Sequence, residues 1–157
     1  MKKCGVVLII LLLSSGCLDF GDDIRLTAPH VTANELTEVT KRTGIQFPAG
    51  TTGLGYFYQG SGIDDALAIK MAIPGAGMNA FLGNDLFQDE YEGSSRIQVG
   101  KGQFWWSPGD LMERKAYNKD LPQGRYVECS LGRAKGQWIA SISWVATWRK
   151  NKSLRKI

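Results

Sequence analysis

Carboxylates are the side chains best suited to acid–base or cation chemistry in this sequence. Asp64 and Asp65 are adjacent, and one short segment carries four more acids, namely Asp85, Asp89, Glu90 and Glu92. Paired carboxylates can act as acid and base or can bind Ca²⁺. Neither group has the ligand spacing of an EF-hand loop, and aspartate is also favoured in turns. We interpret the pair as turn residues and the segment as a solvated acidic surface, with partner docking and metal binding as its alternatives.

Other catalytic patterns are sparse. His30 is the single histidine, so a Ser-His-Asp triad would need serine and aspartate to converge on it from elsewhere in the fold. The sequence has no CxxC, HExxH or P-loop pattern, and the glycines at 75–77 and 100–102 are typical of turns. We therefore predict a protein that is not an enzyme and uses neither a metal nor another cofactor. The alternative is an enzyme built on Asp64, Asp65, Asp89 and Glu90.

The most distinctive motif is Phe104-Trp105-Trp106. Three successive aromatic residues cannot all face inward from one strand, because neighbouring side chains point to opposite faces. At least one should lie at the surface, where tryptophan is a frequent anchor for a partner. The alternative is that the rings fill a gap between a sheet and a helix. We predict a protein-binding surface made of Trp105, Trp106, Asp85, Asp89, Glu90 and Glu92.

The first residues have the layout of a secretory signal peptide. Lys2 and Lys3 precede an apolar run from Val6 to Leu13, and small polar residues follow it. The run is 8 residues long, whereas a helix needs about 20 residues to cross a bilayer. We therefore expect this segment to be removed after export rather than to remain as a membrane span.

Residues 13–17, Leu-Ser-Ser-Gly-Cys, resemble the lipobox of bacterial lipoproteins. The resemblance implies that residues 1–16 are removed, that Cys17 receives fatty chains such as palmitate, and that 17–29 form a spacer to the folded body. Membrane lipid is then one partner of the chain, and each buried methylene strengthens the anchor by about 0.8 kcal/mol. A soluble secreted protein and an uncleaved anchor are the alternatives. Leu18 stands where an inner-membrane lipoprotein has aspartate, which implies the outer membrane, facing the periplasm, in a Gram-negative host.

Removal of the signal leaves 157 − 16 = 141 residues, enough for one domain, which we place at 30–148. Cys4 leaves with the signal and Cys17 carries lipid, so Cys129 is the only cysteine of the body. No disulfide can form within the domain. Cys129 lies in an alternating segment, and we predict a small buried apolar residue rather than a reactive thiol.

The net charge of +4 is concentrated at the ends. Lys2 and Lys3 leave with the signal, and five basic residues fall in the tail at 149–157. The body therefore has a net charge of 12 − 15 = −3, with no basic patch that would indicate nucleic-acid binding. We interpret the tail as a solvated end, with contact to anionic lipid as the alternative.

Hydrophobic periodicity predicts two short helices, at 33–42 and 76–82. The first begins with a capping box formed by Thr32 and Glu35. Alternation predicts strands at 54–59, 66–73, 125–131 and 137–148, and a brief strand at 96–99. Hairpin turns are expected at 60–62 and 132–136, and residues 110–119 fit no element clearly. The sum is an α+β domain, an antiparallel sheet of four to six strands with both helices on one face.

Alternation in the last predicted strand identifies its core face. Trp138, Ala140, Ile142 and Trp144 share one face, and serines share the other. We therefore expect the tryptophan face to pack under the helices and the serine face to be partly exposed to water.

Five short motifs in the body resemble small exported bacterial proteins, some of which are immunity lipoproteins that protect against toxins of neighbouring cells. These motifs are Gln46-Phe47-Pro48, Tyr56-Phe57-Tyr58, residues 62–67, Ile73-Pro74 and residues 105–108. With the lipobox, the resemblance implies a membrane-tethered, non-enzymatic protein-binding module of the cell envelope, for example an immunity protein. The alternative is a structural or assembly lipoprotein of an envelope complex.

Overall fold

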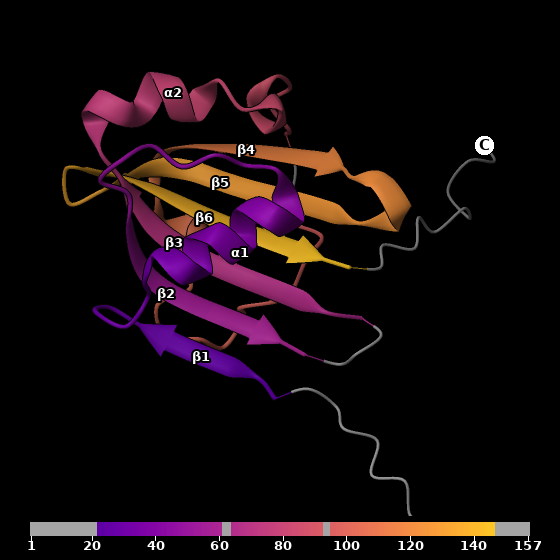
Figure 1. Ribbon diagram of the computed structural model, residues 1–157. Coiled ribbons are helices and arrows are strands. Elements are labelled where there is room, and N and C mark those ends of the chain that lie inside the picture. The colour runs from indigo at the N-terminus through magenta and orange to yellow at the C-terminus, as the bar shows by residue number, and fades with distance from the viewer. Residues whose placement is uncertain (1–21, 61–63, 93–94, 147–157) are drawn as a thin grey trace, which may run out of the picture.

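Six antiparallel strands form one sheet in the computed structural model, which describes residues 22–60, 64–92 and 95–146 (Figure 1). The strand order is β1-β2-β3-β6-β5-β4, so β1 and β4 are the edges. The strands are β1 (Ile24–Thr27), β2 (Thr52–Gln59), β3 (Ala66–Ile73), β4 (Met112–Asp120), β5 (Tyr126–Ala134) and β6 (Gln137–Val145). Short 3₁₀ turns span 75–77, 85–87, 108–110 and 122–124.

The helix α1 (Ala33–Thr43) confirms the prediction for 33–42. It starts at Thr32, whose Oγ1 accepts from the amide of Asn34 at 3.2 Å, while Glu35 accepts from the amide of Thr32 at 2.6 Å. This reciprocal arrangement satisfies amides that have no partner within the helix. The chain leaves the helix at Gly44, whose φ of 79° suits glycine.

The second helix, α2 (Met78–Leu82), follows a 3₁₀ turn and is shorter than the predicted 76–82. Val39 of α1 and Phe81 of α2 are both fully buried in the core over one face of the sheet. Figure 1 shows α1 crossing in front of the sheet and α2 along its upper side. The predicted fold class, an antiparallel sheet with two short helices on one face, is confirmed.

The core lies between the helices and this face of the sheet. Its strand residues alternate as predicted, with Leu67 and Ile69 from β3 opposite Trp144 and Ile142 from β6. A run of aromatic rings closes its upper side, through Phe47, Phe81, Phe87 and Tyr117, with centroid separations of 6.1, 4.8 and 4.9 Å. Aromatic contacts of this kind stabilise a core beyond their burial alone.

The alternation suggested that the other face of the sheet is partly exposed to water, but the middle of this face is buried. Ser141 and Ser143 are buried, because residues 95–111, here called the covering segment, pack over them. The sheet presents small side chains on this face, so a chain segment with large aromatic rings can approach closely. The predicted strand at 96–99 is wrong, since Arg96 lies at a bend, Ile97 and Gln98 have no regular structure and Val99 begins a turn.

The edge strands differ most from the predictions. Residues 24–27 pair with β2, so the domain begins before residue 30 and includes part of the segment predicted as a spacer. Residues 112–120 form β4, which had no clear assignment. Lys135 and Gly136, with φ values of 50° and 78°, connect β5 to β6 in a two-residue turn, tighter than the predicted 132–136 loop.

Some predictions lie outside the described residues. These are the signal peptide, Cys17, most of the 60–62 turn, the end of the predicted strand beyond residue 146 and the basic tail. Within the described ranges, no helix combines the length and the apolar character needed to cross a membrane.

Candidate functional site

Glu128 fixes the start of the covering segment to the sheet. The residue is only 7% exposed, and its carboxylate accepts from the amide of Arg96 at 2.9 Å and from that of Ile97 at 3.4 Å. The hydroxyl of Ser95 donates to the same carboxylate. A buried carboxylate is tolerated when donors surround it, and hydrogen bonds to an ionised acceptor are stronger than neutral ones.

Lys70 fixes the other end of the covering segment. Its Nζ atom, which projects from the central strand β3, donates to the carbonyl oxygen of Trp105 at 3.0 Å and to the hydroxyl of Ser107 at 3.4 Å. Lys70 alternates with Leu67 and Ile69, so its side chain lies on the face opposite the helices. Two charged side chains of the sheet therefore hold the segment, one at its start and one at its aromatic motif.

Trp105 packs flat on the sheet at Gly55. A Cβ atom at Gly55 would lie 2.2 Å from the indole ring, so only glycine leaves room for the ring in this position. Trp105 is 8% exposed and makes an edge contact with Trp106, whose ring centroid is 5.7 Å away. Trp105 forms a buried apolar cluster with Phe57 and Ala68 of the sheet.

Phe104 projects from the covering segment into solvent and is 89% exposed. The preceding chain makes tight turns, in which the amides of Lys101 and Gln103 donate to the carbonyls of Gln98 and Gly100 at 3.1 and 2.9 Å. The next residue, Trp105, is buried, and its backbone carbonyl accepts a hydrogen bond from Lys70. An aromatic ring held in water by a fixed backbone can enter an apolar pocket of a partner with little further loss of conformational freedom.

The structure therefore corrects the prediction that Trp105 presents the surface, whereas the predicted role of the partly buried Trp106 stays a prediction. Trp105 is buried and Trp106 is partly buried, while Phe104, which was not among the predicted site residues, carries the exposure. The alternative reading was also only half right, because Trp105 packs against the sheet face that carries no helix. Glycines at 100 and 102 with φ near 90° mark the turn before Phe104 and were the available signal.

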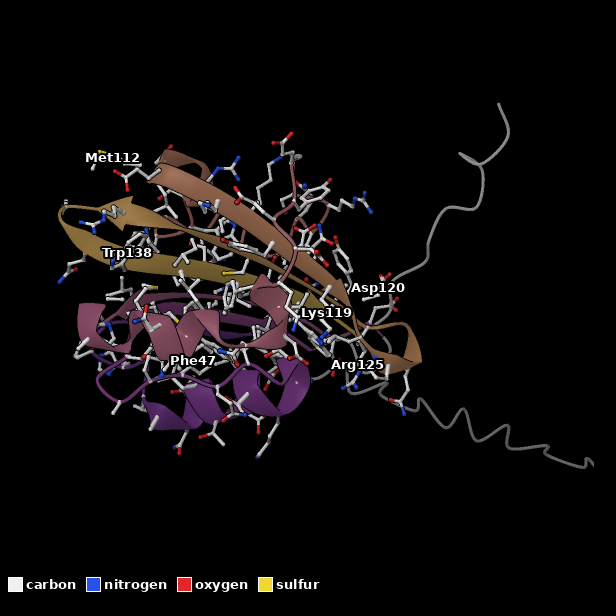
Figure 2. All side chains as sticks on the ribbon, turned by 90° about the horizontal axis from the view of Figure 1, so that it is seen from above. Phe47, Met112, Lys119, Asp120, Arg125 and Trp138 are labelled. Atoms are coloured by element: carbon white, nitrogen blue, oxygen red, sulfur yellow. The ribbon has the colours of Figure 1, made fainter. Side chains whose placement is uncertain are left out.

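The acidic residues of the predicted surface lie along the edge strand β4. Glu90 pairs with Lys115 at 2.9 Å and Asp85 pairs with Lys119 at 3.4 Å, while Asp89 and Glu92 are exposed. In Figure 2, Met112 lies at one end of β4, and Lys119 and Asp120 lie at the other. Exposed pairs of this kind contribute about 0–1 kcal/mol to stability. No group of three or more potential metal ligands occurs among the residues that the structure describes.

The other residues considered for catalysis are Asp65, His30 and Cys129, and none of them lies in a cluster of catalytic groups among the described residues. Tyr58 donates to Asp65 at 2.6 Å, and a guanidinium nitrogen of Arg42 lies 3.9 Å from the same carboxylate. His30 is exposed just after β1. Cys129 is 1% exposed, and burial raises the pKa of its thiol, which confirms the predicted buried residue.

Comparisons of the chain with protein-family models, with curated proteins and with solved structures find no match.

Proposed function

We propose that the chain is a membrane-tethered lipoprotein of the cell envelope that binds a protein partner and catalyses no reaction. The observation that carries the proposal is the exposed ring of Phe104 on a backbone fixed to the sheet. A large apolar side chain in water is unfavourable for the free protein, and contact with a partner would remove it from solvent. The partner surface is therefore centred on Phe104 rather than on the tryptophans.

The position of β1 sets how far the domain can reach from its anchor. The strand begins at Ile24, which is 24 − 17 = 7 residues after Cys17. Seven residues span at most about 25 Å when fully extended. A lipid on Cys17 would thus keep the domain next to the membrane, where it meets partners that cross or approach that membrane. Protection against an incoming toxin, the task of an immunity protein, fits this placement.

Replacement of Cys17 by alanine tests the anchor. We expect the variant to lose incorporation of radiolabelled palmitate and to move from the membrane fraction to the soluble fraction, because its fatty chains supply the membrane affinity. The control is Cys129→Ala, which should keep both label and fractionation. Unlabelled wild-type protein, or a Cys17→Ala variant that still fractionates with membranes, would contradict the proposed lipidation.

Replacement of Phe104 by alanine tests the partner surface. A photoreactive phenylalanine at position 104 should first crosslink the partner in the native envelope. For the isolated complex, we expect Phe104→Ala to raise Kd by about 10-fold to 100-fold, the range of a central aromatic anchor. Met112→Ala is the matched control, because Met112 is also an exposed apolar residue, on the edge strand β4. Equal Kd values for Phe104→Ala and wild type would remove Phe104 from the interface.

A further inference from the structure

Small side chains form the face of the sheet beneath the covering segment. Ser141 on β6 lies opposite Lys70 on β3 and opposite Ser130 on β5. Ala116 on β4 lies opposite Ser130 and completes the row. Serine and alanine side chains are too short to fill the whole space under the covering segment, and a cavity remains there.

The cavity has a volume of about 20 Å³, measured as the space open to the centre of a water molecule. About 10–15 Å³ of such space holds one water molecule, provided that polar groups surround it. The cavity is therefore large enough for one water molecule and too small for a metabolite. Its polar walls include Ser130, Ser141, Ser143 and Glu128 from the sheet and Tyr91 and Trp106 from the loops above.

Ser141 provides the second observation. It is 2% exposed, and its Oγ atom makes no hydrogen bond to any protein atom that the structure describes. The comparable buried hydroxyl of Thr43 donates to the carbonyl oxygen of Val39 at 2.7 Å. A buried hydroxyl that has left bulk water without gaining a partner destabilises the fold. The position of Ser141 in the cavity wall indicates where its partner lies.

We propose that one ordered water molecule occupies this cavity and hydrogen-bonds to Ser141 Oγ. The water satisfies the buried hydroxyl, and its other hydrogen bonds go to the polar walls of the cavity. It lies between β6 and the covering segment, beneath the backbone that presents Phe104. The site depends on neither the lipid anchor nor a protein partner.

A crystal structure of the mature protein in detergent, at a resolution that shows ordered water, tests the proposal directly. We expect one peak of density about 2.7–3.2 Å from Ser141 Oγ, with at least one further polar atom of the cavity wall within the same distance. An empty cavity, or a Ser141 hydroxyl that donates to a protein atom, would overturn the proposal.

Thermal unfolding of Ser141→Ala provides an independent test, because the direction of the change in Tm depends on whether water satisfies the Ser141 hydroxyl. If water satisfies the hydroxyl, removal of the hydroxyl deprives that water of a partner and Tm falls by a few degrees. If the hydroxyl has no partner, its removal relieves an unfavourable burial, and Tm stays the same or rises. The variant's crystal structure is the control: the water peak should weaken while the covering segment keeps its position.

Discussion

Replacement of Trp105 by alanine is expected to lower the free energy of unfolding by about 3–5 kcal/mol, the range for removal of a buried aromatic residue. The indole ring is 8% exposed and fills the space above Gly55. Without the ring, the covering segment loses its apolar contact with Phe57 and Ala68, and the sheet face beneath it becomes accessible to water. Urea denaturation followed by circular dichroism measures the loss.

Phe104→Ala is the matched control for this prediction, because Phe104 is the adjacent aromatic residue and is exposed. We expect it to change the free energy of unfolding by less than about 0.5 kcal/mol. Gly55→Ala tests the same contact from the side of the sheet. Its new Cβ would overlap the indole ring, so this variant should also be destabilised. Equal stabilities of the Trp105 and Phe104 variants would contradict the assigned burial.

The elements that could be predicted from the sequence are those with local or alternating signals. Thr32 and Glu35 form a capping box three residues apart, so the start of α1 depends on no distant residue. Leu67 and Ile69 alternate with smaller or polar residues because the two faces of β3 have different neighbours, apolar helices on one side and the covering segment on the other.

The edge strands could not be predicted in the same way. Strand β4 begins with Met112, Glu113, Arg114 and Lys115, all exposed, and its register is interrupted between Met112 and Lys115. Charged residues and irregular pairing protect an open sheet edge from other strands, and they also erase the apolar alternation that identifies a strand. Strand β1 has only four residues and is half exposed, so it is too short for alternation to identify it.

The sequence identified the aromatic motif of the site but not which of its rings faces solvent. The sequence singled out the aromatic motif, yet which ring faces solvent depends on Gly55 and Lys70, which lie far from Trp105 in the chain. Glu128 gave no signal at all, because an acidic residue in an alternating strand looks like a solvent-facing position. Its partners, Ser95, Arg96 and Ile97, are 31 to 33 residues away.

Replacement of Glu128 by alanine is expected to lower the free energy of unfolding by about 2–4 kcal/mol, because it leaves one buried and two part-buried donors without an acceptor. Two of these donors are the amides of Arg96 and Ile97. Glu128→Gln keeps one acceptor oxygen and nearly the same shape, so we expect about half of that loss. Urea denaturation measures both variants under identical conditions.

Hydrogen exchange distinguishes a local role of Glu128 from a general loss of stability. In Glu128→Ala, the amides of Arg96 and Ile97 should exchange faster by a larger factor than the amide of Gly44, which donates to the carbonyl of Thr40 at 2.8 Å in α1. If the exchange rates of all three amides rose by the same factor, Glu128 would stabilise the whole domain without specifically holding the covering segment. Phe104 would then sit on a backbone held by Lys70 and Trp105 alone, and the case for a preformed binding surface would be weaker.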